Sequence, residues 1–178
     1  MELTTVGTMG RMGIEIITLE PLHWEQVRQI FLDGIATGHA TFETSASSWA
    51  QWDSNHLKPG RIVAVSAETG EVVGWAALNP VSARRVYAGV AEVSVYVAKD
   101  ARQTGVGKAL LVSLVQVSEQ NGLWTLQASV FPENVASIAL HKTCGFREVG
   151  IRERIGCLNG VWRDTVLLER RSKLIGKS

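Results

Sequence analysis

Alternating apolar and polar positions, together with short apolar runs, mark several stretches of the chain as strands. Side chains alternate between the two faces of a strand, so each stretch can bury at least one face. Turn-forming residues bound most of these stretches, as expected for strands of a small domain. The predicted strands are Ile14 to Leu19, Arg61 to Ala67, Val72 to Leu78, Glu92 to Val97 and Trp124 to Phe131.

Helical spacing of apolar residues follows the first predicted strand. Pro21 suits the first position of a helix, where its missing N–H costs nothing. Apolar residues three or four positions apart then predict the buried face of that helix: Val27, Ile30, Phe31 and Ile35. A short helix is predicted around Trp49 and Trp52, which lie three residues apart and face the same way.

Two later helices are bounded by start and stop signals. One follows the glycine turn and runs to about Gln120, where Asn121-Gly122 supplies the stop. The other is capped by Asn134 and runs to about Thr143, before Gly145 ends it. Both helices are preceded by a predicted strand, which indicates a chain of alternating strands and helices.

Two turn signals complete the organisation of the chain. Glu68-Thr69-Gly70-Glu71 joins two predicted strands into a hairpin. The segment 147–169 is interpreted as two further strands folded back through Asn159-Gly160, the preferred pair of a two-residue turn. We expect a flexible extension at 1–13, a single α/β domain at 14–172 and a C-terminal tail at 173–178.

Composition narrows the class of protein. The chain has 178 residues, 46% hydrophobic and 20% charged, with a formal net charge of +1. This near-neutral balance gives no reason to expect a nucleic acid or a membrane as partner. The N-terminal sequence does not read as a signal peptide, so we expect a cytoplasmic protein. Cys144, Cys157 and the histidines are not at metal-ligand spacing, so we expect no metal.

The segment Arg102 to Lys108 is the most informative stretch. It connects the strand ending at Val97 to a helix and reads Arg-Gln-Thr-Gly-Val-Gly-Lys. The first N–H groups of a helix lack intrahelical partners, and glycines let a phosphate approach them closely. The spacing differs from both the dinucleotide-binding turn and the P-loop. The pattern therefore indicates a pyrophosphate site, with an ordinary turn as the alternative interpretation.

Two segments together resemble the GNAT acetyltransferases. The first is this Arg-x-x-Gly-x-Gly turn between a strand and a helix. The second runs from Asn134 to Phe146 as Asn-x-x-Ser-x-x-Leu-His-x-x-x-Gly-Phe. Further motifs are similar to the phosphinothricin and methionine sulfoximine N-acetyltransferase branch: Ala40-Thr41-Phe42-Glu43, Ala83-Arg84-Arg85-Val86-Tyr87, Glu92-Val93-Ser94-Val95-Tyr96-Val97 and Trp162-Arg163-Asp164. The resemblance implies an α/β (α+β) fold whose mixed, centrally splayed sheet is flanked by helices.

The resemblance also implies how acetyl-CoA, the expected cosubstrate, is bound. In the family it lies between two splayed parallel strands, here those ending near Val97 and Phe131. Backbone groups of the first strand pair with the pantetheine, and an amide there can stabilise a developing oxyanion. The glycine turn cradles the pyrophosphate, and Asn134, which is also a suitable helix cap, contacts the far side. The implied cofactor-binding residues are Val95, Tyr96, Val97, Arg102, Gln103, Thr104, Gly105, Val106, Gly107, Lys108, Asn134 and Ser137.

Glu92 and His141 are the expected catalytic residues. Glu92 shares a strand face with Ser94 and Tyr96, a pattern that a half-solvated structural strand also produces. The branch has glutamate at this position, which implies a general base for the substrate ammonium group. His141 stands where much of the superfamily has tyrosine. It can protonate the leaving thiolate, help to deprotonate the amine or serve only in packing, and the sequence leaves these roles open.

The resemblance places substrate recognition in two loops. Phe42 and Tyr87 are expected to wall the substrate side chain, with Glu43 beside them. Arg84 is expected to clamp an α-carboxylate through two hydrogen bonds, unless it forms a solvated loop tip. Arg163 and Asp164 are expected to serve packing or a contact between subunits, because relatives commonly form homodimers.

The expected activity is acetylation of the α-amine of a small amino acid or of an analogue of the phosphinothricin or methionine sulfoximine type. Two alternatives stay open at this point. One is an acetyltransferase for another amine, such as a polyamine, an aminoglycoside or a peptide N-terminus. The other is a non-catalytic module that binds coenzyme A, against which the presence of both Glu92 and His141 argues.

Overall fold

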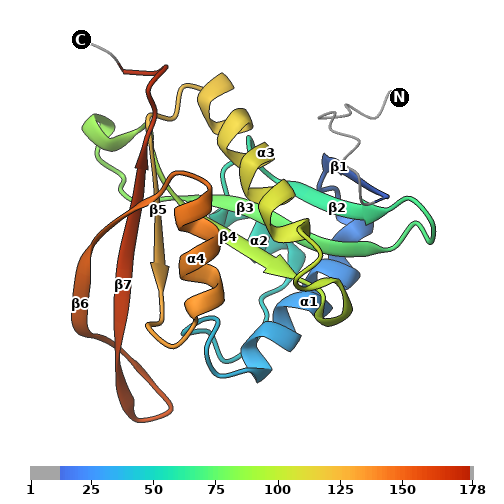
Figure 1. Cartoon of the computed structure of the whole chain (residues 1–178), viewed down its shortest axis with the longest axis horizontal. Coiled ribbons are helices and arrows are strands. Elements are labelled where there is room, and N and C mark those ends of the chain that lie inside the picture. The colour runs from blue at the N-terminus through green and yellow to red at the C-terminus, as the bar shows by residue number, and fades with distance from the viewer. Residues whose placement is uncertain (1–12, 177–178) are drawn as a thin grey trace.

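A seven-stranded mixed sheet forms the centre of the protein (Figure 1), in a computed structural model that describes residues 13–176. The strand order is β1-β2-β3-β4-β5-β7-β6. Only β4 and β5 run parallel, and every other neighbouring pair is antiparallel. The strands are β1 (Ile14–Thr18), β2 (Ile62–Ser66), β3 (Val72–Pro80), β4 (Val90–Val97), β5 (Thr125–Val130), β6 (Arg147–Leu158) and β7 (Val161–Arg171).

Helices cover both faces of this sheet, so the prediction of a mixed sheet flanked by helices is confirmed. The predicted cap signals are also seen: Pro21 opens a short 3-10 helix that leads into α1, and Asn134 caps α4. The α-helices are α1 (Trp24–Ala36), α2 (Trp49–Asn55), α3 (Val106–Gln120) and α4 (Val135–Thr143). Three short 3-10 helices, η1 (Pro21–His23), η2 (Arg85–Tyr87) and η3 (Lys99–Ala101), complete the described segment.

Two hydrophobic clusters hold the layers together, one on each side of the sheet. On one side, α1 and α2 bury Val27, Ile30 and Trp52 against β2 and β3. On the other, α3 buries Leu110, Leu111 and Leu114, and Leu140 of α4 packs at the margin. Of the predicted buried face of α1, Val27 and Ile30 are buried, whereas Phe31 and Ile35 are half-buried.

The long β6–β7 hairpin extends the sheet beyond β5. Its turn has the predicted geometry, since Asn159 (φ 50°) and Gly160 (φ 81°) both adopt the left-handed conformation of a two-residue hairpin turn. An irregularity between Arg152 and Gly156 bends β6, and Arg154 takes a positive φ of 47° there. The backbone N–H of Arg154 donates a 2.8 Å hydrogen bond to the Asp164 carboxylate, so Asp164 stabilises this bend.

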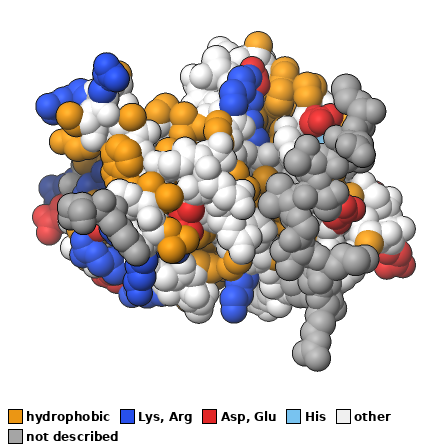
Figure 2. Space-filling model, turned by 90° about the horizontal axis from the view of Figure 1, so that it is seen from above, with side chains coloured by type: hydrophobic (Ala, Val, Ile, Leu, Met, Phe, Trp, Pro, Cys, Tyr) orange, Lys and Arg blue, Asp and Glu red, His pale blue; other side chains and the backbone are white. Residues whose placement is uncertain are grey.

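The predicted extension at 1–13 lies almost wholly outside the described residues, as does the end of the predicted tail. The described residues contain no helix that is both long and apolar enough to cross a membrane. On the face shown in Figure 2, basic and acidic side chains are interspersed with hydrophobic ones instead of forming a continuous basic strip.

Candidate active site

The sheet opens at its centre, where β4 and β5 separate (Figure 1). Their parallel pairing covers only Val90 to Glu92 on β4 and Thr125 to Gln127 on β5. Both strands continue, to Val97 and Val130, so the facing edges beyond Glu92 have backbone groups that no strand partner occupies. At the last paired position, the side-chain amide of Gln127 donates a 2.9 Å hydrogen bond to the Glu92 carboxylate. Glu92 therefore lies at the apex of a V-shaped opening.

A cavity of about 840 Å³ lies in this opening, and most of the predicted site residues line it. Its walls come from β4, β5, the starts of α3 and α4, and the loop between α1 and α2. The predicted residues that line it are Phe42, Glu43, Glu92, Val95, Tyr96, Val97, Arg102, Gln103, Gly105, Gly107, Lys108, Asn134, Ser137 and His141.

The glycine turn presents the start of α3 to this cavity. Gln103 (φ 64°) and Gly105 (φ 92°) adopt left-handed conformations, and Gly105 is the N-cap of α3 without any side-chain cap. The N–H groups of the first helical turn are consequently free to point at an anion. A Cβ on Gly107 would lie 3.2 Å from Leu140 Cδ2 and 3.5 Å from Val97 Cγ2, so glycine also permits close packing against α4 and β4.

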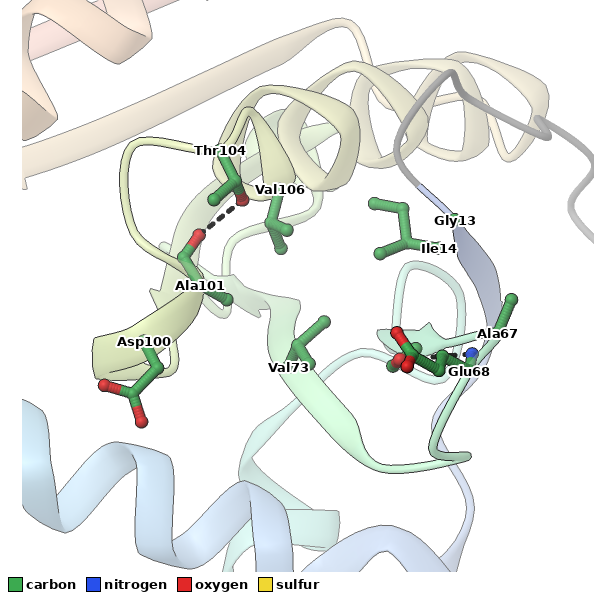
Figure 3. A pocket seen from close by; sticks show the side chains of 10 residues that line it. Gly13, Ile14, Ala67, Glu68, Val73, Asp100, Ala101, Thr104 and Val106 are labelled. Atoms are coloured by element: carbon green, nitrogen blue, oxygen red, sulfur yellow. Dashed lines mark hydrogen bonds between the residues drawn. The ribbon is translucent and has the colours of Figure 1, made fainter.

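Thr104 and Val106 are predicted site residues whose side chains face a different hollow. The Thr104 hydroxyl donates a 2.7 Å hydrogen bond to the Ala101 carbonyl (Figure 3). The hollow measures about 540 Å³ and lies between this turn and the start of β1 near Gly13, with Glu68 and Asp100 as its charged side chains. Any contact of these two residues with a ligand in the central cavity is therefore limited to their backbone groups.

Asn134 joins two parts of the cavity wall. Its Oδ1 accepts a 3.2 Å hydrogen bond from the Ser137 N–H, which is the predicted helix cap. Its Nδ2 donates a 3.3 Å hydrogen bond to the His39 carbonyl in the α1–α2 loop. The nearby Arg163 guanidinium lies over the Phe131 ring at 4.3 Å and donates a 3.3 Å hydrogen bond to the Gly38 carbonyl. These two hydrogen bonds hold the α1–α2 loop at the opening of the sheet.

The two ring nitrogens of His141 differ in their hydrogen bonding. Its Nδ1 lies 2.8 Å from the Ser137 carbonyl oxygen, which can only accept a hydrogen bond, so Nδ1 carries the proton. Its Nε2 is buried and has no hydrogen-bond partner among the described residues. Burial lowers the pKa of His141, and the Ser137 carbonyl opposes this only in part. The ring is therefore neutral near pH 7, with an accepting lone pair at Nε2.

Tyr96 is packed against α1, on the strand face that it shares with Glu92. Its ring stacks on Trp75 at 4.8 Å and meets Phe31 edge-on at 5.0 Å. A Cβ on Gly34 would lie 3.0 Å from this ring, so α1 contacts the strand closely here. Burial raises the pKa of Tyr96 to about 12, and its hydroxyl stays protonated at any physiological pH.

The two predicted substrate loops are placed differently. Phe42 lies in the cavity wall, edge-on to Phe131 at 4.7 Å, and Glu43 is exposed at the same wall. Arg84 and Tyr87 are exposed and lie outside the residues that line the cavity. The Arg84 guanidinium lies 5.4 Å from the centre of the Tyr87 ring. The structure thus places the first loop in the wall of the cavity that Glu92 also lines, and leaves the second at the surface of the chain.

Several polar residues of the cavity region were not anticipated from the sequence. Gln127 supports Glu92, Ser129 and Thr165 line the cavity, and Arg152 reaches Ser129 from β6. Gln127 and Ser129 lie two positions apart in the strand before α4. Their spacing could have predicted that both side chains lie on one polar face of β5. Arg152 gave no such signal, because only the three-dimensional hairpin brings it near β5. The described residues contain no group of three or more His, Cys, Asp or Glu that could hold a metal ion.

Comparison with known proteins agrees with this geometry. Residues 26–167 match the family model described as "Acetyltransferase (GNAT) domain". A phosphinothricin N-acetyltransferase of Alcaligenes faecalis is 32% identical over 148 residues, which cover 81% of this chain and 75% of the relative. An L-methionine sulfoximine/L-methionine sulfone acetyltransferase of Pseudomonas aeruginosa is 32% identical over 124 residues, covering 70% and 72%.

A solved structure resembles the whole fold. It is a GNAT superfamily phosphinothricin acetyltransferase from Sinorhizobium meliloti in complex with acetyl-CoA, with a TM-score of 0.81 and 29% identity. The similarity covers 90% of this chain and 89% of that one.

Proposed function

This chain belongs to the GNAT acetyltransferase family, and we propose that it moves an acetyl group from acetyl-CoA to the α-amine of a small amino acid or analogue. The observation that carries this proposal is the position of Glu92. Its carboxylate lies where β4 and β5 separate, and it lines the same cavity as the uncapped start of α3. A proton acceptor and an anion site thus share one opening.

We propose that acetyl-CoA binds in the V-shaped opening. The free backbone edge of β4 near Val95 and Val97 suits the amide groups of pantetheine. The N–H groups at the start of α3 and the side chain of Lys108 suit the pyrophosphate. The solved phosphinothricin acetyltransferase from Sinorhizobium meliloti is in complex with acetyl-CoA.

The proposed reaction is a direct transfer in a ternary complex. Glu92 takes one proton from the substrate ammonium group, because only the neutral amine can attack. The nitrogen then bonds to the thioester carbon, and a β4 backbone N–H stabilises the oxyanion. The C–S bond breaks as the nitrogen loses its second proton. His141 Nε2, with its free lone pair, accepts that proton and passes it to the departing sulfur.

The amino acid class rests on the names of relatives, which act on phosphinothricin or on methionine sulfoximine and methionine sulfone. We propose compounds of this kind as substrates. The test is thiol release from acetyl-CoA by the purified chain with a panel of amines. Activity with methionine sulfoximine or phosphinothricin above that with spermidine, an aminoglycoside or an alanyl peptide supports the proposal. Preference for one of the latter amines contradicts the substrate class, and no thiol release with any amine supports a non-catalytic module.

We further propose a homodimer in the cytoplasm. Apolar side chains are exposed along the β6–β7 hairpin, and Trp162 is 62% exposed. The others are Val149, Ile151, Ile155 and Val161. Exposed apolar surface of this kind is typical of a contact between subunits. Light scattering of the purified chain should give twice the monomer mass, and Trp162→Asp should reduce it to the monomer mass.

A further inference from the structure

Arg152 does not line the central cavity itself but contacts its wall through Ser129, and no carboxylate among the described residues balances its charge. It extends from β6 across β7, and its Nη2 donates a hydrogen bond to the Ser129 hydroxyl on β5. Its Nε is buried, and no hydrogen-bond partner for it lies within residues 13–176. Among the described residues, no carboxylate oxygen lies within 4.0 Å of its nitrogens, whereas Arg163 is paired with Glu133 at 3.2 Å. A half-buried guanidinium in this state favours an incoming anion.

Thr165 adds a second unsatisfied donor at the same place. It lies directly opposite Arg152 in the β6–β7 register and lines the central cavity. Thr165 is only 2% exposed, and its Oγ1 has no hydrogen-bond partner among the described residues. A buried hydroxyl that makes no hydrogen bond costs free energy in the unliganded protein, which a ligand oxygen can recover.

The position of this pair relative to Glu92 matches a zwitterion. Glu92 lies opposite Gln127 on β5, and Ser129, which Arg152 contacts, is two residues further along that strand. Residues two apart on a strand share a face and lie roughly 6.6 Å apart. The negative Glu92 and the positive Arg152 therefore lie at either end of a short polar strip, as the ammonium and carboxylate of an α-amino acid require.

We infer that Arg152, with Thr165 beside it, binds the α-carboxylate of the substrate and so selects amino acids over simple amines. This inference rests on the proposed amino acid N-acetyltransferase activity. Arg152 is a specificity residue in this scheme and takes no part in proton transfer. Ser129 orients its guanidinium, and the N–H groups that Ser129 does not occupy are the proposed donors to the carboxylate.

The test compares L-methionine sulfone with 3-(methylsulfonyl)propylamine, which lacks only the carboxylate. Arg152→Gln should raise the KM for the acid at least about tenfold, leave kcat near its original value and leave both constants for the amine unchanged. Arg152→Lys keeps the charge, so its KM for the acid should lie between those of the unaltered protein and Arg152→Gln. Arg154→Gln, on the same strand but exposed, is the matched control and should behave as the unaltered protein.

Thr165→Val provides an independent arm, because it removes the unpartnered hydroxyl and keeps the shape. It should raise the KM for the acid severalfold while thermal stability stays equal or increases. A purely structural role for Arg152 predicts equal losses for acid and amine with a lower melting temperature. If Arg152→Gln does not fold, an unchanged KM for the acid in Thr165→Val counts against the site.

The kinetic measurements test the carboxylate site and the proposed activity separately. If the unaltered enzyme prefers the acid and Arg152→Gln retains that preference, the carboxylate site is wrong and the activity stands. If Arg84→Gln alone abolishes the preference, the exposed loop holds the clamp instead. If the unaltered enzyme does not prefer the acid, both the substrate class and the site are wrong.

Discussion

The Gln127 side chain fixes the Glu92 carboxylate by a 2.9 Å hydrogen bond at the last paired position of β4 and β5. One carboxylate oxygen is thereby oriented, and the other is available to a substrate proton. Beyond this pair the strands diverge, so the proposed base lies at the apex of the opening. The register of three residue pairs thus determines where the opening begins and where Glu92 lies.

Glu92→Gln should lower kcat by about 10²- to 10⁴-fold at neutral pH, with little change in acetyl-CoA affinity. The substitution keeps the shape of the side chain and its contact with Gln127, and it removes only the proton acceptor. The loss should shrink as pH rises, since more substrate then arrives as the neutral amine. A pH–rate profile checks this, and a variant profile that matches the unaltered enzyme throughout would show that Glu92 is not the base.

Gln127→Leu should lower kcat by about tenfold through loss of orientation of Glu92, without a matching rise in the KM for acetyl-CoA. Gln127→Asn, whose shorter amide does not reach the carboxylate, should behave similarly. In a Glu92→Gln background, Gln127→Leu should have almost no further effect. Independent, multiplicative losses in the double variant would mean that Gln127 acts through another group.

His141 should make the stability of the fold depend on pH. Burial lowers its pKa below the 6.5 of an unfolded histidine, so between these two values the unfolded chain binds more protons. Stability should therefore be fully present above pH 6.5 and decline as pH falls below it, by at most about 1.4 kcal/mol per pH unit for this one group. Denaturant titrations of His141→Gln should show a smaller decline, the remainder coming from His23 and His56, whose pKa values burial also lowers. Equal slopes in both proteins would contradict a neutral, buried His141.

Local signals predicted the elements of this fold well, and long-range geometry limited the prediction of the site. Pro21, Asn134 and the Asn159-Gly160 pair act within a few residues, so the sequence located their helix starts and turn. The gathering of Glu92 and His141 in one cavity followed from family resemblance, because periodicity alone left each a structural alternative. Arg152 could not be predicted, since its contact with Ser129 spans three strands of the sheet.

Gly107→Val should raise the dissociation constant for acetyl-CoA by about tenfold or more, because a branched side chain obstructs the start of α3. The same side chain presses on Leu140, whose Cδ2 lies 3.2 Å from the site of a Cβ. The double variant Gly107→Val/Leu140→Ala relieves that contact and separates the two effects. Its thermal stability should partly recover while calorimetric titration still gives weak binding. Recovery of affinity in the double variant would assign the defect to packing instead of phosphate access.

Gly156→Ala should change which side chains the enzyme accepts. A Cβ at Gly156 would lie 2.8 Å from Cε1 and Cζ of Phe42, closer than carbon atoms approach in folded proteins, so the Phe42 ring must move. Phe131 blocks one direction, since its ring centre lies 4.7 Å from that of Phe42, and the cavity is the open side. The KM should rise by about tenfold for methionine sulfone and much less for alanine, because only the longer side chain needs the lost space.

Adding Phe42→Leu should restore the acceptance of methionine sulfone, because the smaller side chain leaves room for the new methyl group. Gly150→Ala is the matched control: it lies on the same strand, and a Cβ there meets no atom of the described part of the chain within 4 Å. Steady-state kinetics with both amino acids check these expectations. A uniform fall in kcat with both substrates in Gly156→Ala, unrelieved by Phe42→Leu, would mean that β6 has shifted as a whole and that Phe42 does not set the size of the substrate pocket.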